Sequence, residues 1–234
     1  MKKNLRIGII FLLLAISMIS ACAPDINEPN DALPRAQVRF IHAASTAQEL
    51  DFAVMNTVGA TLLYVQRETQ YGRQYRYDFF KTGERDFRLL PSGTTLNIAR
   101  TVRTLEADAK FTAFAIDAGN TIDTLILVAR DTVATPSPGK AFVRFIHASS
   151  DAGAISITGD NVSIQNFERR GVSRYFTVDA GTQNFTIQFS DNTTLDVPQT
   201  FFSQGVFTLV ISGFRGAGVN RTPLNVRSFL ETSL

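Results

Sequence analysis

Cysteine, histidine and tryptophan are nearly missing from this sequence, which has one Cys, two His and no Trp in 234 residues. A single cysteine excludes a disulfide within the chain. A stable zinc site usually needs several clustered nitrogen or sulfur ligands, so two distant histidines predict no metal site. The lack of tryptophan also removes the largest aromatic platform for a sugar ring.

Recognisable catalytic motifs are missing as well. The sequence has no G-x-S-x-G nucleophile turn and no glycine-rich phosphate-binding loop. Its Asp and Glu residues are too scattered to suggest the paired carboxylates of a glycosidase. We therefore predict that the protein is not an enzyme and that it has no catalytic residues and no cofactor.

The charge gives no support to a nucleic-acid partner. Three of the 23 basic residues, Lys2, Lys3 and Arg6, precede Cys22 in a stretch without acidic residues, which leaves 20 basic against 21 acidic side chains in the rest. Nucleic-acid binding proteins carry a clustered basic footprint. We therefore expect no nucleic acid among the partners.

The N-terminus has the layout of a bacterial secretory signal, with basic residues, an apolar run over 7–16 and then small residues. The apolar run is too short for a membrane span, which takes about 20 residues. Ile19-Ser20-Ala21-Cys22 resembles the lipobox, where a signal is cut before a cysteine that receives lipid. We predict a signal peptide over residues 1–21 and lipidation of Cys22.

Lipid on Cys22 would make a membrane one partner of the protein, since several buried acyl chains hold a protein firmly. Residues 22–35 are rich in proline, asparagine and acid, which predicts a flexible tether. The expected location is the bacterial cell envelope outside the cytoplasm, at the outer membrane, facing either the periplasm or the cell surface.

An internal repeat organises the remaining chain. The hexapeptide VRFIHA at 38–43 recurs without change at 143–148, and six identities in a row are hard to obtain by chance. Weaker matches follow in the same order. We predict two homologous domains, over 36–134 and 140–234, joined by a proline-containing linker at 135–139.

Short β-rich runs fill each copy between Gly, Asn, Asp and Pro residues. The run at 185–189 alternates between apolar and polar residues, whereas 124–128 and 207–211 are nearly all apolar and predict strands buried on both sides. About 100 residues with some seven short strands are typical of an immunoglobulin-like sandwich, with a barrel as the alternative. The predicted fold is all-β, with two tandem immunoglobulin-like β-sandwich domains.

The repeated block also resembles a known family. Residues 143–157, VRFIHASSDAGAISI, are similar to the opening strand and turn of the bacterial family called domain of unknown function 4397. The matching positions are Arg144, His147, Ser149 and Asp151 in the second copy and Arg39, His42 and Asp51 in the first. Two family prolines are replaced in both copies. The resemblance implies an immunoglobulin-like sandwich on an exported bacterial protein and no known activity.

The two histidines occupy the same repeat position, which duplication alone explains. Each could bind a turn carbonyl in a structural role, or serve as a metal ligand, base or pH switch, and we favour the structural role. His147, Ser149 and Asp151 are close in sequence, but a hydrolytic triad also needs a nucleophile on a tight turn and an oxyanion hole.

Tyr71, Arg73 and Tyr75 form a polar and aromatic cluster outside the repeated block, and we consider it a possible binding edge. The leading functional hypothesis is a membrane-anchored, non-catalytic protein that presents its sandwiches to a protein or glycan partner, in adhesion or envelope organisation. The alternative is an accessory carbohydrate-binding lipoprotein of a nutrient-uptake system.

Overall fold

The computed structural model describes residues 34–118, 124–132, 134–216 and 221–231. The predicted signal peptide, Cys22 and nearly all of the tether lie outside these residues, and Arg35, assigned to the tether, begins the first strand. The described residues form sixteen strands and no helix. Among them there is accordingly no apolar helix long enough to cross a membrane. The prediction of an all-β fold is confirmed.

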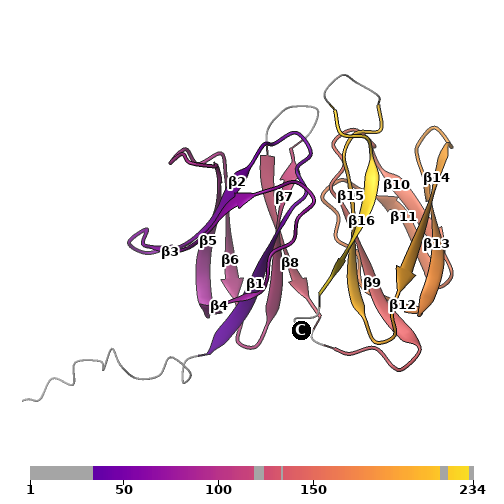
Figure 1. The fold of residues 1–234 in the computed structure, drawn as a ribbon, viewed down its shortest axis with the longest axis horizontal. Coiled ribbons are helices and arrows are strands. Elements are labelled where there is room, and N and C mark those ends of the chain that lie inside the picture. The colour runs from indigo at the N-terminus through magenta and orange to yellow at the C-terminus, as the bar shows by residue number, and fades with distance from the viewer. Residues whose placement is uncertain (1–33, 119–123, 133, 217–220, 232–234) are drawn as a thin grey trace, which may run out of the picture. The chain divides into compact units, whose positions relative to one another are not determined.

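The first eight strands build one sandwich of two four-stranded sheets (Figure 1). They are β1 (Arg35–His42), β2 (Leu50–Asn56), β3 (Leu62–Thr69), β4 (Asp78–Lys81), β5 (Gly83–Pro91), β6 (Ala99–Leu105), β7 (Lys110–Asp117) and β8 (Thr124–Asp131). The strand orders are β4-β1-β7-β8 and β3-β2-β5-β6. β1 and β7 pair in parallel, and the other neighbours are antiparallel.

The next eight strands build a second sandwich with the same design. They are β9 (Lys140–His147), β10 (Ile155–Gly159), β11 (Val162–Phe167), β12 (Phe176–Asp179), β13 (Gly181–Gln188), β14 (Thr194–Phe201), β15 (Val206–Ser212) and β16 (Asn225–Leu230). The orders β12-β9-β15-β16 and β11-β10-β13-β14 repeat the first sandwich strand for strand. The prediction of two immunoglobulin-like sandwiches is confirmed.

Each sandwich has its own apolar core, built from the inward positions of its strands. Phe40, Phe52 and Phe87 lie in the first core, and Phe145 and Phe185 lie in the second. Because side chains alternate across a strand, the intervening residues of β1 and β9 point away from these cores. They carry the repeated arginines.

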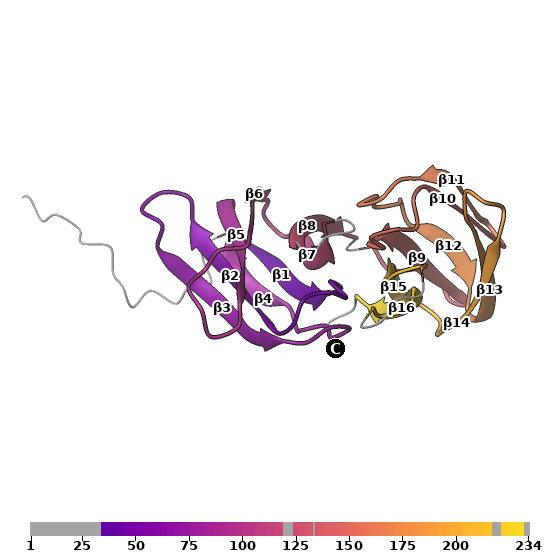
Figure 2. The same cartoon turned by 90° about the horizontal axis from the view of Figure 1, so that it is seen from above.

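A third apolar cluster joins the two sandwiches. It contains residues of the sheets β4-β1-β7-β8 and β12-β9-β15-β16, which face each other (Figure 2). Its buried members are Ile41, Ala43, Phe114, Ile116, Ala129, Ile146, Ala148, Val210 and Phe229. The central strands of these inner sheets, β1, β7, β9 and β15, are therefore covered on both faces, which explains why they read as nearly continuous apolar runs.

Candidate functional site

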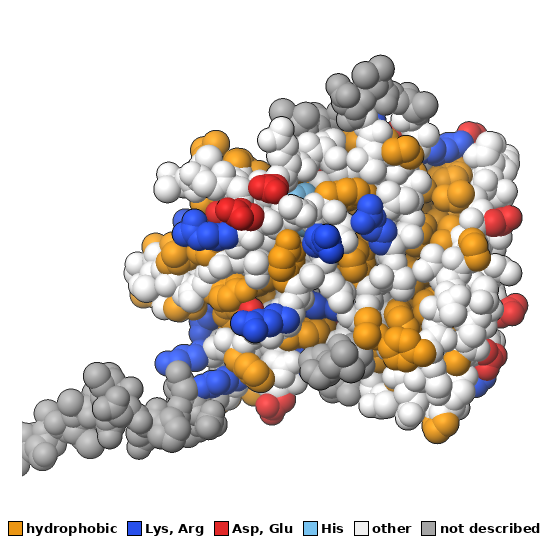
Figure 3. Space-filling view, in the orientation of Figure 1, with side chains coloured by type: hydrophobic (Ala, Val, Ile, Leu, Met, Phe, Trp, Pro, Cys, Tyr) orange, Lys and Arg blue, Asp and Glu red, His pale blue; other side chains and the backbone are white. Residues whose placement is uncertain are grey.

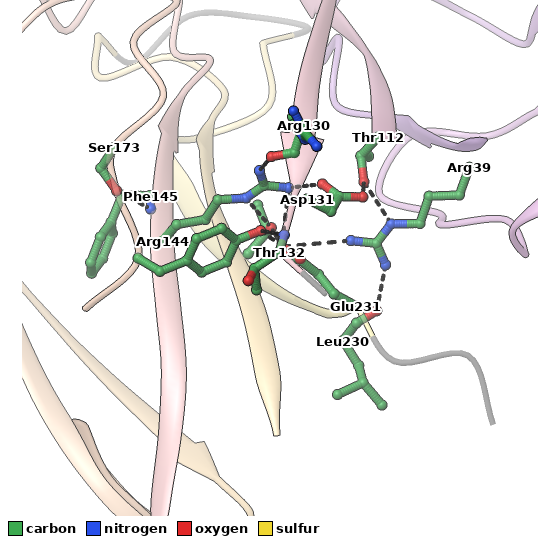
Figure 4. A network of polar contacts seen from close by, with 12 residues as sticks. Arg39, Thr112, Arg130, Asp131, Thr132, Arg144, Phe145, Ser173, Leu230 and Glu231 are labelled. Atoms are coloured by element: carbon green, nitrogen blue, oxygen red, sulfur yellow. Dashed lines mark hydrogen bonds and ion pairs between the residues drawn. The ribbon is translucent and has the colours of Figure 1, made fainter. Parts of the chain in front are cut away.

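The two repeated arginines lie between the sandwiches. Arg39 on β1 and Arg144 on β9 are each only 1% exposed. Figure 4 shows Asp131, the last residue of β8, and Glu231, which follows β16, lying between them. A buried arginine must be paired and hydrogen-bonded to be tolerated, so the partners of each guanidinium decide whether this arrangement is stable.

Arg144 reaches from the second sandwich into the first. Its Nη1 donates to the carbonyl oxygen of Arg130 at 2.8 Å, and its Nη2 binds the carboxylate of Asp131. The same Nη2 lies 3.0 Å from Oε1 of Glu231. One guanidinium therefore connects β8 of the first sandwich with the end of the second.

Arg39 makes the reciprocal connection. Its Nη1 donates to the carbonyl oxygen of Leu230, the residue before Glu231, and its Nη2 lies 3.9 Å from Oε1 of Glu231. Each arginine thus binds the carbonyl that precedes the acidic residue of the opposite sandwich. The exchange links the inner sheets in both directions.

A threonine and a tyrosine of the first sandwich hold its acidic residue. Arg39 Nε donates to Thr112 Oγ1 at 2.8 Å, and this hydroxyl donates to Asp131 Oδ2 at 2.7 Å. The hydroxyl of Tyr77 donates to the same oxygen at 2.7 Å. The Arg39 guanidinium also lies over the Tyr77 ring, 5.0 Å from its centroid.

The second sandwich repeats this arrangement around Glu231. Arg144 Nε donates to Thr208 Oγ1 at 2.8 Å, and Thr208 donates to Oε1 of Glu231. The hydroxyl of Tyr175 donates to Oε2 at 2.6 Å, and its ring lies 5.0 Å below the Arg144 guanidinium. The network between the sandwiches is therefore symmetric in its residue types except that Asp131 is matched by a glutamate.

Burial and charge act together on these groups. Burial alone would lower the pKa of Arg144, but the charges of Asp131 and Glu231 raise it above its ordinary value. Burial raises the pKa of Glu231 despite the opposing effect of Arg144. Burial also raises the pKa of Tyr77 and Tyr175, so both hydroxyls remain protonated donors.

We expect Tyr175→Phe to lower the free energy of unfolding by about 1.5 to 3 kcal/mol, because a buried carboxylate loses a hydroxyl donor. Urea unfolding followed by circular dichroism measures the change. Tyr75→Phe is the control, since its hydroxyl accepts the backbone amide of Gln70 at 3.1 Å. Equal losses in the two variants would contradict a special role of Tyr175.

The two histidines hold equivalent turns. Nε2 of His42 lies 3.0 Å from the carbonyl oxygen of Gln48, and Nε2 of His147 lies 2.7 Å from that of Gly153. A carbonyl only accepts, so Nε2 carries the proton in both rings. Nδ1 of each ring has no hydrogen-bond partner among the described residues. Burial lowers the pKa of both, and each ring is neutral at pH 7.

The arrangement in the second copy is not that of a hydrolytic triad. Ser149 Oγ donates to the carbonyl of Gly213 at 2.8 Å, away from His147. Asp151 Oδ1 accepts the backbone amide of Arg215 at 2.7 Å, and Oδ2 accepts the next amide at 3.0 Å. Ser149 and Asp151 thus both fix the loop that follows β15, whereas His147 fixes the turn at Gly153.

Tyr71 and Tyr75 take part in internal contacts, and Arg73 is exposed. The Tyr71 hydroxyl lies 2.9 Å from Ser212 Oγ of the second sandwich, and the Arg227 guanidinium lies 4.8 Å from the Tyr71 ring centroid. Tyr75 packs against the first core. The structure therefore places this cluster partly between the sandwiches and does not present it as one exposed edge.

A hollow of about 290 Å³ lies on the outer face of the sheet β3-β2-β5-β6. Its lining residues are Asp51, Ala53, Met55, Leu62, Val65, Arg67, Arg88, Leu90, Thr94, Thr95 and Asn97. The register places Ala53 opposite Val65 and Arg88, so these side chains share the outer face. The loop before β6 supplies the two threonines and the asparagine.

Two carboxylates of this sheet, those of Asp51 and Asp86, are buried. Asp51 Oδ1 accepts the Ser92 hydroxyl at 2.5 Å and the Glu68 amide at 2.8 Å. Asp86 accepts two hydrogen bonds from Arg88, at 2.7 and 3.0 Å, and one from Arg100 at 2.8 Å. Of the family-motif positions, Asp51 is the one that lines the hollow.

The outer sheet of the second sandwich has different chemistry. Its corresponding strands place Ser156, Thr158, Thr186 and Gln188 on one face. The Thr186 hydroxyl donates to Asp196 at 2.9 Å, and the Ser156 hydroxyl donates to the Gln165 side chain at 3.2 Å. Two sandwiches of the same topology therefore differ in the chemistry of their outer faces.

Sequence reasoning missed Asp131, Glu231 and the arginines of the hollow. The acidic pair is hard to see because Asp in one copy is matched by Glu in the other, after loops of different length. Strand alternation in 50–56 and 83–91 was the available signal for the hollow. Among the described residues, no group of three or more His, Cys, Asp or Glu could hold a metal ion.

Comparisons with solved structures find likenesses of fold at low identity. The Bacillus anthracis TIE protein is 6% identical with a TM-score of 0.28 over 76% of this chain, which spans 34% of that protein. The tip fimbrial protein Mfa3 from Porphyromonas gingivalis is 10% identical and has a TM-score of 0.25. The match covers 84% of this chain and 99% of that one. A candidate cell adhesion protein from Bacteroides uniformis is 9% identical, with a TM-score of 0.25 and coverages of 87% and 99%.

No curated protein matches the sequence. A family model does match, over residues 36–158, which is more than half of the chain. The match contains all of the first sandwich except Arg35, and it contains β9 and nearly all of β10 of the second, including both arginines and both histidines described above. The chain belongs to the family described as Domain of unknown function (DUF4397).

Proposed function

We propose that this protein is a lipid-anchored, non-catalytic binding protein of the bacterial cell envelope, with a role in adhesion or envelope organisation. A cleaved signal, lipid on Cys22 and a tether attach it to a membrane outside the cytoplasm. The two sandwiches form the body that it presents, and the outer sheet of the first sandwich contacts a partner.

The difference between the two outer sheets carries this proposal. The face in the first sandwich combines an aliphatic hollow with arginine side chains, whereas the corresponding face in the second is covered with small polar groups. Hollows with an apolar lining and a few placed polar groups are typical of binding sites. The buried contacts between the sandwiches favour presentation of this face on a fixed body.

Anchoring is tested by Cys22→Ser. We expect the unchanged chain to incorporate labelled palmitate and to partition into detergent, and the variant to lose both properties, because acyl chains provide the membrane affinity. Ala21→Ser, next to the expected lipidation position, serves as a matched control. Membrane retention of Cys22→Ser at the level of the unchanged chain would contradict the proposal.

Contact through the first sandwich is tested in intact cells with a photo-crosslinking amino acid. The label replaces Leu62, an exposed residue that lines the hollow, or Thr158 on the outer face of the second sandwich. We expect a discrete adduct from position 62 and none from position 158. Equal labelling from both positions would count against a binding face on the first sandwich.

A further inference from the structure

We propose that the hollow on the first sandwich binds an extended acidic peptide segment that carries an aliphatic residue. This inference rests on the proposed function and names the chemistry of the partner.

The floor is aliphatic. Ala53, Met55, Val65 and Leu90 line it, and Leu62 at its edge is 54% exposed. A space of about 290 Å³ accommodates an aliphatic side chain of a ligand. Removal of such a side chain from water provides a driving force of about 25 cal/mol per Å² of apolar surface.

Among the residues that line the hollow, the exposed charge is positive. The side chains of Arg67 and Arg100 are 70% and 53% exposed, whereas those of Asp51 and Asp86 are 6% and 1% exposed. The carboxylates are already bound by backbone, hydroxyl and guanidinium donors. Figure 3 shows basic side chains, with some acidic ones beside them, among the apolar side chains over the first sandwich. A ligand that approaches this face therefore meets guanidinium groups, which favour carboxylates.

The lining favours a peptide over a glycan. None of the residues that line the hollow is aromatic, so a sugar ring finds no platform on which to stack. Thr94, Thr95 and Asn97 offer side-chain donors and acceptors at the rim. An extended peptide alternates its side chains and leaves backbone groups free, so it can place an aliphatic residue in the hollow and acidic residues near the arginines.

A single methionine reports on the hollow. Met55 is the only one of the three methionines that follows Cys22, and it lies in the floor. The processed lipoprotein in detergent micelles, labelled with methyl-13C methionine, therefore gives one methyl signal from this site. The probe is a short peptide in which Leu and Asp alternate, with matched peptides in which Lys replaces Asp or Ser replaces Leu.

We expect the Leu/Asp peptide to shift the Met55 methyl signal in a saturable way and the two matched peptides to leave it in place. Arg67→Glu should weaken the affinity by about tenfold, as expected for loss of a charge-assisted contact. Arg67→Gln should have a smaller effect in the same direction. Arg174→Glu, at an exposed position of the second sandwich, should bind as the unchanged chain does.

Three results would overturn the inference. The first is that the Lys peptide binds as tightly as the Asp peptide, and the second is that Arg67→Glu leaves the affinity unchanged. The third is that oligogalacturonate shifts the Met55 signal and the acidic peptide does not, a result that would assign the hollow to glycans. If the peptide does not shift the Met55 methyl signal but position 62 still gives a specific crosslink in cells, the acidic peptide is rejected as ligand and the binding face of the proposed function is retained. If the peptide binds but Cys22→Ser is retained at the membrane as the unchanged chain is, only the anchoring part of the proposed function is rejected.

Discussion

Arg144→Met is expected to lower the free energy of unfolding by about 3 to 5 kcal/mol, the usual result of removing one partner from a buried ion pair. Methionine fills much of the space of the arginine stem but leaves the carboxylates of Asp131 and Glu231 without their shared cation. The expected loss therefore comes mainly from uncompensated buried charge. Urea unfolding of the full chain measures it.

A double-mutant cycle separates charge from packing. Asp131→Asn removes the charge that binds Arg144, so the combination with Arg144→Met should cost less than the sum of the single changes. Arg103→Met is the matched control at an exposed arginine and should stay within about 0.5 kcal/mol of the unchanged chain. Additive losses, or a loss from Arg144→Met no larger than that of the control, would refute an energetic role of the network.

Acidification is expected to destabilise the protein through His42 and His147. Burial lowers the pKa of both rings below the ordinary value of 6.5, against smaller opposing effects that include the hydrogen bonds to Gln48 and Gly153. Below pH 6.5 the unfolded chain takes up these protons before the folded one does. Stability is then lost at up to about 1.4 kcal/mol per pH unit for each histidine, until the pH reaches the folded pKa.

The combined variant His42→Gln and His147→Gln tests this expectation, because glutamine keeps a donor for the turn carbonyl but does not titrate. Its free energy of unfolding should fall less between pH 7 and pH 5 than that of the unchanged chain. Glu231 has a raised pKa and acts in the opposite direction, but it is present in both proteins and cancels in the comparison. Identical pH profiles would show that the histidines do not titrate on unfolding.

Much of the fold could be predicted because strand patterns are local. The residue pattern indicates directly which faces of a strand are buried, through alternation in β2 and β13 and apolar runs in β8 and β15. The duplicated VRFIHA block indicates equivalent strands. The hydrogen bond of each histidine to a turn carbonyl could also be anticipated from one residue in one repeated position. These features depend on neighbours along the chain or on an exact repeat.

The candidate site was much less accessible from the sequence. Arg39 and Arg144 were noted only as family positions, because their acidic partners belong to other strands and differ in type. Tyr71 was expected at a binding edge, but its hydroxyl contacts Ser212 of the second sandwich. The hollow collects residues from three strands and one loop, and strand register, which no short motif specifies, brings Arg67 and Arg88 to the same face.

Local sequence patterns are sufficient to establish an all-β chain with a repeated strand block whose residues alternate between two buried faces, since side-chain period and apolarity depend on neighbouring residues. That the second buried face of each inner sheet lies against the other sandwich became clear from the packing of the folded chain. Two arginines could be placed there because carboxylates far away in sequence come within ion-pair distance when the sheets pack. That pairing depends on how two faces meet in space, which no local pattern encodes.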